Sequence, residues 1–191
     1  PLAVTTCRGE LGDVVGQQGF DRLVPFVTRP VADGRVARSG PSAEHLVIGE
    51  DVGQVLEVVG GGEDYDALIR QAQQLGIYHA CRFTGRIPAA EIPAYYRLAS
   101  VLVDPVEDNP VGRTRLPIKL FESWVSQTPF VTADVGDRRR VLGEPPAGLL
   151  ALPGDPAALA VEIERVLGSR ELAASLAARG QQRAQEYTWE K

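Results

Sequence analysis

Short apolar runs alternate with amphipathic stretches along the chain from residue 55 onward. The apolar runs are rich in Val and Leu without strict polar alternation, which is typical of strands whose two faces are both buried in a parallel sheet. Runs of this kind predict strands at 55–60, 81–85, 100–105, 129–134 and 147–153. The amphipathic stretches predict helices at 64–76, 89–99, 118–126, 136–143, 155–168 and 170–187. This alternation predicts a doubly wound α/β domain, with a parallel sheet and helices on both faces.

Capping residues mark the ends of several of these helices. Asp155 can accept hydrogen bonds from free backbone N–H groups, and it precedes Pro156, a residue suited to the first helical position. Gly76 and Gly168 stand where two helices should end, because glycine readily adopts the conformation that closes a helix.

The first 54 residues are less regular than the rest. Residues 13–16 followed by 19–27 indicate a strand, a glycine turn and a helix, which would be a first βα unit. Residues 28–54 mix Gly, Pro, Ser and Arg with one short apolar run, and we assign them to loops or to a junction. The predicted organisation is an irregular N-terminal part at 1–54 and an α/β domain at 55–191.

Composition and charge narrow the class of protein. The chain has 191 residues, of which 44% are hydrophobic and 24% charged, as in globular proteins. The formal net charge is −5 and no tract is rich in Lys or Arg. The sequence therefore predicts no basic surface that could make the phosphate contacts on which DNA or RNA binding depends. No apolar run reaches the roughly 18 residues that span a bilayer, and no signal peptide opens the chain. We expect a soluble, cytoplasmic protein that does not bind nucleic acid.

Metal and nucleophile chemistry have few candidate residues. Cys7 and Cys81 are the only cysteines, His45 and His79 are the only histidines, and they form no spaced cluster. A structural zinc site or a His-based catalytic triad is therefore not expected.

A ligand of an open α/β sheet binds beyond the carboxyl ends of the strands. Four predicted turns or loops lie there: Gly16, the three glycines at 60–62, residues 85–87 and the long loop 106–116. Glycine lets backbone N–H groups approach a phosphate, and a helix N-terminus presents free N–H groups to an anion. This arrangement fits a nucleoside diphosphate, although three glycines serve equally well as a tight strand-to-helix turn.

The helix that follows the long loop carries two charged residues on one face. With Pro117 at its first position, Lys119 and Glu122 lie one turn apart on a polar stripe that continues through Ser123 and Ser126. The opposite side is apolar, is expected to be buried against the sheet, and comprises Ile118, Leu120, Phe121, Trp124 and Val125.

Two interpretations of the Lys119 and Glu122 stripe stay open. It is either a solvated ion pair, which contributes about 0.2–0.5 kcal/mol, or part of a binding site. The second interpretation follows from position, because a helix that begins beyond a strand's carboxyl end turns its first residues toward the ligand. There an ammonium can meet a phosphate, and a carboxylate can accept hydrogen bonds from both hydroxyls of a ribose.

Four segments together resemble one family. They are a glycine turn after "LEVVG" at 56–60, "FTG" at 83–85, a strand ending in Asp-Pro at 104–105, and "KLFES" followed by "TPFVT" within 119–132. Over about residues 55–189 the chain resembles the C-terminal half of family 4, or group 1, glycosyltransferases. The resemblance implies the GT-B fold, in which two Rossmann-like domains face each other and the C-terminal domain binds a nucleotide-sugar donor.

The resemblance also implies roles for individual residues. Glu122 matches the second glutamate of the family's Glu-x7-Glu motif, which binds the donor ribose. Thr114 stands where the first glutamate is expected, so the chain departs from the motif at the position that serves the donor sugar. The sequence "PIKLFE" resembles a subgroup in which Lys119 takes a larger share of the phosphate contacts.

A second, N-terminal segment resembles the part of the family that clamps the donor diphosphate. Residues 14–24 match a glycine turn at Gly16, but without the family's Arg and Lys at the clamping positions. The resemblance then assigns the clamp either to residues missing from this turn or to Arg113, Arg115 and Lys119.

The turn at Gly85, Arg86 and Ile87 matches the place where relatives bind the nucleotide base, largely through backbone groups. Arg86 has a second interpretation as an ordinary surface arginine.

The sequence thus predicts the donor-binding domain of a nucleotide-sugar-dependent glycosyltransferase. As the resemblance implies, the enzyme is expected to be retaining and independent of metal and of cofactors, with the nucleotide sugar as a substrate. The acceptor site, and any contact with a membrane surface, would belong to an N-terminal domain that precedes Pro1. Residues 1–191 alone are expected to be inactive.

Two alternatives stay open beside this prediction. A nucleotide-sugar epimerase shares the fold, but it relies on carboxylate and histidine groups from both domains that this chain does not display. A degenerate GT-B domain that binds a partner protein without catalysis is favoured by Thr114 and by the missing basic residues near Gly16.

Overall fold

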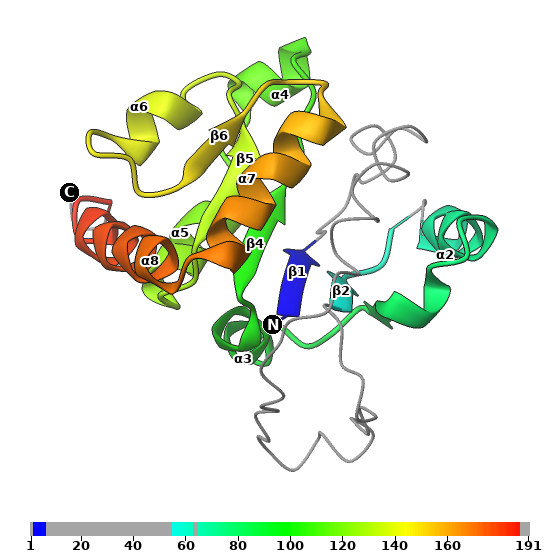
Figure 1. Ribbon diagram of the computed structural model, residues 1–191. Coiled ribbons are helices and arrows are strands. Elements are labelled where there is room, and N and C mark those ends of the chain that lie inside the picture. Colours follow the sequence, from blue (N-terminus) through cyan, green and yellow to red (C-terminus); the bar gives the residue numbers. More distant parts are fainter. Residues whose placement is uncertain (1, 7–54, 63–64, 188–191) are drawn as a thin grey trace.

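The computed structural model describes residues 2–6, 55–62 and 65–187, and the structural statements below concern these ranges. They form a six-stranded sheet in the order β3-β2-β1-β4-β5-β6, with every neighbouring pair parallel (Figure 1). The strands are β1 (Leu2–Thr6), β2 (Val55–Val59), β3 (Cys81–Gly85), β4 (Val101–Asp104), β5 (Phe130–Ala133) and β6 (Leu149–Ala151). This is the strand order of a Rossmann-like, doubly wound sheet, which confirms the predicted fold class.

Helices connect the strands and follow the last of them. They are α2 (Tyr65–Gln74), the 3-10 helix η1 (Tyr78–Ala80), α3 (Ile92–Leu98), α4 (Pro110–Thr114), α5 (Ile118–Val125), α6 (Arg138–Leu142), α7 (Pro156–Gly168) and α8 (Arg170–Ala184). Every strand and helix predicted from residue 55 onward is present, with each end within three residues of its expected place. None of the helices in the described ranges is long and apolar enough to cross a bilayer.

Strand β1 was not predicted, and it changes the domain organisation. It lies between β2 and β4, pairing Leu2 with Val55 and Ala3 with Val101. The sheet therefore includes chain on both sides of the boundary that we placed between residues 54 and 55. A five-residue run that ends in two threonines carries too little periodicity to identify a central strand. The strand expected at 13–16 and the helix expected at 19–27 lie outside the described residues.

The sheet is buried on both faces, which explains the continuous apolar runs. In β4, Leu102 packs into one core cluster while Val101 and Val103 pack into another. The first cluster includes residues of α3 and α5, and the second includes residues of α7 and α8. Figure 1 shows α7 crossing one face of the sheet. Because successive side chains of a strand point to opposite faces, burial on both faces favours apolar residues at consecutive positions.

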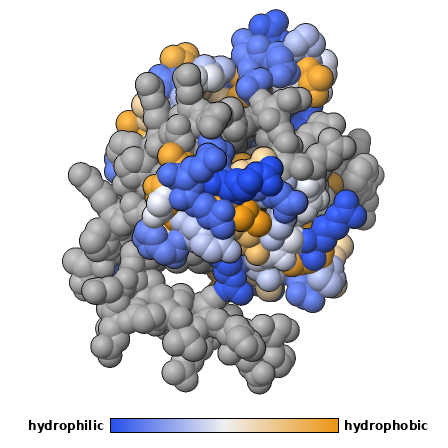
Figure 2. All heavy atoms as spheres, turned by 90° about the vertical axis from the view of Figure 1, so that its right-hand side faces the viewer, coloured by the Kyte–Doolittle hydropathy of each residue, from blue (hydrophilic) through white to orange (hydrophobic). Residues whose placement is uncertain are grey.

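Helix α2 covers the sheet near β3 with one apolar face. Leu68 and Ala72, one turn apart, are buried, whereas Asp66, Arg70 and Gln73 are exposed. Figure 2, which looks onto this side of the molecule, shows a predominantly hydrophilic described surface with scattered apolar residues. The amphipathic pattern of the sequence therefore corresponds to one buried and one solvated side of this helix.

The predicted capping residues occur at helix ends. The Asp155 carboxylate accepts from the N–H groups of Ala157 and Ala158 at 2.9 and 3.1 Å, and Pro156 is the first residue of α7. Gly76 follows α2 with a φ of 71°. Gly168 is the last residue of α7, and Ser169 is both the C-cap of α7 and the N-cap of α8.

Helices α5 and α8 meet at a position that only glycine fits. Trp124 of α5 is 1% exposed, and its indole Nε1 donates to the carbonyl of Ala147 at 2.9 Å. A Cβ added at Gly180 of α8 would overlap the Trp124 ring. The ring is held by its hydrogen bond and by the surrounding core, so it cannot move aside without cost.

We expect Gly180→Ala to lower the free energy of unfolding by about 1–3 kcal/mol, because it overpacks the contact with Trp124. Gly168→Ala is the matched control, since a Cβ at Gly168 meets no atom within 4 Å. Urea unfolding of both variants measures the difference. Equal unfolding midpoints of the two variants would show that a Cβ at Gly180 fits beside Trp124 without destabilising the fold.

Candidate functional site

The topological switch point of the sheet lies between β1 and β4. From these neighbours the strand order runs to β2 and β3 on one side and to β5 and β6 on the other. Ligands of open α/β sheets bind outside the carboxyl ends of the strands at such a point. Asp104 is the last residue of β4, and the chain then passes through α4 into α5. The side chains around Asp104 therefore mark the position of the candidate site.

Asp104 is a buried carboxylate shared by two cations. Lys119 Nζ lies 2.8 Å from one carboxylate oxygen, and Arg138 Nη2 lies 3.3 Å from the other. The side chains of Asp104 and Arg138 are 1% and 0% exposed, whereas that of Lys119 is 17% exposed. We call these three residues the Asp104 cluster. Lys119 is thus the only member of the cluster whose side chain is more than marginally exposed.

Arg138 connects the cluster to the loop beyond β4. Its Nη1 group donates to the carbonyl oxygens of Gly112 and Arg115, each at 3.1 Å, and to that of Val135 at 3.2 Å. The Thr132 hydroxyl of β5 donates to the Asp104 carbonyl at 2.8 Å. These bonds attach α4 and the turn after it to the carboxyl edge of the sheet.

Burial and neighbouring charges shift the pKa values of Asp104 and Arg138. Burial alone would raise the pKa of Asp104, but the charge of Lys119 and its hydrogen bond, together with those of Arg138, outweigh it and hold this pKa below its ordinary value. Burial lowers the pKa of the Arg138 guanidinium, yet arginine is so basic that the group stays charged in a protein. Asp104 and Arg138 therefore form a buried, ionised pair at neutral pH.

The faces of α5 differ from those that we predicted. Ser123, expected on the polar stripe, is fully buried, and its hydroxyl donates to the Leu120 carbonyl at 2.7 Å. Val125, expected to be buried, is 71% exposed, and Ile118 is 56% exposed. The buried face is centred on Leu120, Ser123 and Trp124, because the large Trp124 ring sets the rotation of this short helix. Pro117 is the N-cap residue and not the first helical residue.

Lys119 and Glu122 have different partners. Lys119 reaches Asp104, whereas Glu122 Oε2 accepts a hydrogen bond from the Tyr96 hydroxyl of α3 at 2.8 Å. Glu122 is half-buried. The stripe is therefore not an ordinary solvated Lys/Glu pair, which was the first of its two interpretations.

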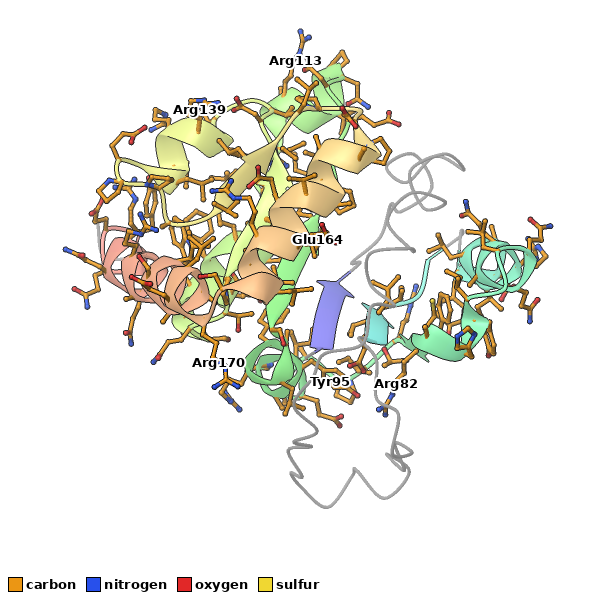
Figure 3. The ribbon with its side chains drawn as sticks, viewed as in Figure 1. Arg82, Tyr95, Arg113, Arg139, Glu164 and Arg170 are labelled. Atoms are coloured by element: carbon orange, nitrogen blue, oxygen red, sulfur yellow. The ribbon has the colours of Figure 1, made fainter. Side chains whose placement is uncertain are left out.

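The predicted residues of the long loop lie in and just after α4. Asn109 caps this helix by accepting from Gly112 N at 2.8 Å. Arg113 pairs with the exposed Asp108 at 2.5 Å, and Figure 3 shows its side chain extending outward from α4. The Thr114 hydroxyl donates to carbonyls of its own helix, and the Arg115 carbonyl accepts from Arg138. Neither Arg113 nor Thr114 thus joins the Asp104 cluster.

Gly85 and Arg86 mark the other end of the candidate site, where β3 ends. Gly60 N donates to the Gly85 carbonyl at 2.9 Å, and Gly85 has a φ of 65°. Arg86 is exposed, and its stem lies so close to Gly61 that a Cβ there would be 3.2 Å from Arg86 Cγ.

Strands β3 and β4 are three inter-strand spacings apart, which is about 14 Å. A ligand that reaches both ends must be elongated. Gly16 lies outside the described residues.

Three residues around the site were not among the candidate site residues named from the sequence. Asp104 is the one carboxylate in the apolar run "SVLVDP", which was a usable signal. Arg138 shares a helical face with the buried Val141 and Leu142, so its spacing also marked it for burial. Tyr96 had no comparable signal, because its partner Glu122 is 26 residues away.

The comparisons with known proteins identify the family. A model of the family described as glycosyl transferases group 1 matches residues 21–183. The chain belongs to this family. The chain is 34% identical over 129 residues to the D-inositol 3-phosphate glycosyltransferase of Frankia alni, a match that covers 68% of this chain and 30% of that protein. This member of the group 1 glycosyltransferases thus spans less than a third of that relative's length.

Solved structures share its fold. Anabaena HepE, crystallised with UDP and glucose, superposes with a TM-score of 0.71 at 17% identity, over 97% of this chain and 43% of that chain. The C-terminal domain of the group 1 glycosyltransferase LpcC from Francisella tularensis superposes with a TM-score of 0.67 at 17% identity, over 97% of this chain and 85% of that domain. The described sheet and helices are accordingly those of the C-terminal half of a GT-B glycosyltransferase.

Proposed function

We propose that this chain is the donor-binding part of an enzyme that transfers a sugar from a nucleotide-sugar donor to an acceptor with retention of the anomeric configuration. The observation that carries the proposal is the Lys119 ammonium, which Asp104 holds at the carboxyl end of β4 beside the switch point. Family membership and the UDP and glucose bound by HepE support the class of ligand.

Lys119 is suited to the donor diphosphate. An ammonium has three N–H donors, and its short distance to Asp104 fixes its position, while 17% of the Lys119 side chain is exposed. When the sugar is transferred, negative charge grows on the departing diphosphate, and a fixed cation stabilises that charge without rearranging. Since the Arg113 side chain extends outward from α4 and does not join the Asp104 cluster, we assign the larger share of this stabilisation to Lys119.

Glu122 is suited to the ribose and the β3 end to the base. A carboxylate has acceptor capacity for both ribose hydroxyls, and one turn of α5 separates Glu122 from Lys119. Backbone groups at Gly85 and Arg86 would bind the base some distance away along the sheet edge. Thr114 provides no carboxylate at the donor-sugar position, so specificity for the sugar must come from other groups.

The test is titration of the chain with UDP, GDP and ADP by calorimetry, followed by assays of the complete polypeptide with the corresponding nucleotide sugars. We expect one nucleotide to bind best and its sugar to be transferred to an acceptor, with the product's anomeric configuration read by NMR. Interconversion of sugars without an acceptor would instead identify an epimerase. Failure of all three nucleotides to bind would favour a degenerate domain that binds a partner protein.

A further inference from the structure

The hydrogen bond between Tyr96 and Glu122 joins two helices across the candidate site. The Tyr96 hydroxyl lies 2.8 Å from Glu122 Oε2, and Tyr96 is 3% exposed. Within the described ranges, no second group bonds to this carboxylate. We infer that Tyr96 is a positioning residue, whose hydroxyl holds Glu122 in the orientation that receives the donor ribose. The inference rests on the proposed function.

Tyr96 is itself fixed from the other side. The Thr128 hydroxyl donates to the Tyr96 carbonyl at 2.6 Å, and Thr128 is 2% exposed. Thr128 follows α5, so α3 is bonded both to α5 and to the segment that leads into β5. The aromatic ring packs in the core cluster with Leu120 and Trp124 of α5. The phenol therefore has a defined place from which to orient the carboxylate.

Among the described residues, the Glu122 carboxylate keeps acceptor positions beyond the one that Tyr96 uses. A carboxylate offers about four acceptor positions on two oxygens, and Tyr96 occupies one of them on Oε2. Oε1 and the remaining position on Oε2 can each accept from a ribose hydroxyl. Without the phenol, the glutamate side chain could adopt other rotamers, and binding would have to include the cost of ordering it.

A purely structural role for the hydroxyl makes a different prediction. If the bond only satisfied a buried phenol, its loss would change stability and would affect all nucleotides alike. If it positions Glu122, its loss matters only for a ligand that carries the hydroxyls that Glu122 binds. The ribose of the ligand is therefore the variable that separates the two roles.

We would measure binding of the tightest of UDP, GDP and ADP, and of its 2′,3′-dideoxy counterpart (the deoxynucleotide), which lacks both ribose hydroxyls, to the parent chain and to Tyr96→Phe. We expect Tyr96→Phe to weaken binding of the ribonucleotide roughly two- to tenfold and to leave binding of the deoxynucleotide almost unchanged. Glu122→Ala should abolish the effect of Tyr96→Phe, since no carboxylate remains to be positioned. Tyr95→Phe, at a half-buried tyrosine on the same helix, is the matched control (Figure 3).

The outcomes separate this inference from the proposed function. Equal ribonucleotide affinities for the parent and Tyr96→Phe overturn the inference alone. Equal weakening of ribo- and deoxynucleotide also overturns it, because the hydroxyl would then act on the fold as a whole. If none of the three nucleotides binds the parent chain, the proposed function fails and the inference fails with it.

Discussion

Replacing Asp104 with Asn should lower the free energy of unfolding by about 3–5 kcal/mol at neutral pH. The substitution keeps the shape of the side chain but removes the charge that Lys119 and Arg138 share at 2.8 and 3.3 Å. Arg138 is fully buried, so its cation would lose its counterion without gaining solvent. Urea unfolding followed by tryptophan fluorescence measures the loss, which is a large share of the stability of an ordinary domain.

Two further variants test this explanation. Asp108→Asn removes another aspartate paired with an arginine, but that pair is solvated, so we expect stability close to that of the parent. Asp104→Leu combined with Arg138→Met replaces the buried charges with apolar side chains and should recover much of the stability lost by Asp104→Asn. A double variant as unstable as Asp104→Asn would show that shape, and not the unpaired charge, causes the loss.

Acid should affect the parent more than Asp104→Asn. Because the folded-state pKa of Asp104 is lowered, its charge stabilises the fold above the unfolded-state pKa of about 3.9. That stabilisation is lost as the pH falls through this value toward the lower folded-state pKa. Unfolding free energies measured between about pH 7 and pH 3 should therefore converge as the pH falls. A constant gap across this range would contradict the assignment of the charge to Asp104.

Most of the fold could be predicted from the sequence because helices cover both faces of the sheet. Leu102 and Val103 of β4 point to different core clusters, so the strand appears in sequence as an unbroken apolar run. Strand β1 was not predicted, because it is identified only by its pairing with strands at Val55 and Val101, which lie far along the chain. Central position in a sheet is a property of the assembled strands and leaves no local signal in a five-residue segment.

The candidate site was harder to predict from the sequence than the fold, because its side chains have partners on other helices and strands. Arg138, Arg139 and Arg140 are consecutive and chemically identical, yet Arg138 is buried against Asp104 while the other two pair with exposed or half-buried aspartates. The sequence placed Lys119 on the helix after β4 and left it two partners, Glu122 on the same helix or a ligand phosphate. The observed partner, Asp104, comes from the strand, through tertiary packing that periodicity does not describe.

Glu122 provides the sharpest test of the proposed site. Its carboxylate keeps one position for Tyr96 and has others for a ligand, so a role in the fold and a role in binding are both physically reasonable. Glu122→Gln separates them, because a glutamine can still accept from the Tyr96 hydroxyl through its amide oxygen. The fold then keeps its hydrogen bond, while the negative charge is lost from the ligand side.

Glu122→Gln should weaken nucleoside diphosphate binding, and kcat/KM in the complete enzyme, roughly tenfold to hundredfold, with little change in unfolding temperature. The amide turns an NH2 donor toward a ribose hydroxyl that the carboxylate oxygen accepted from, so at least one charge-assisted hydrogen bond is lost. Glu162→Gln, at a residue of α7 paired with Arg165, is the matched control and should bind like the parent. Calorimetric titration alongside thermal unfolding measures both quantities. Near-identical affinities of the parent and Glu122→Gln would remove Glu122 from the ribose site, and Lys119 would then be the remaining support for donor binding.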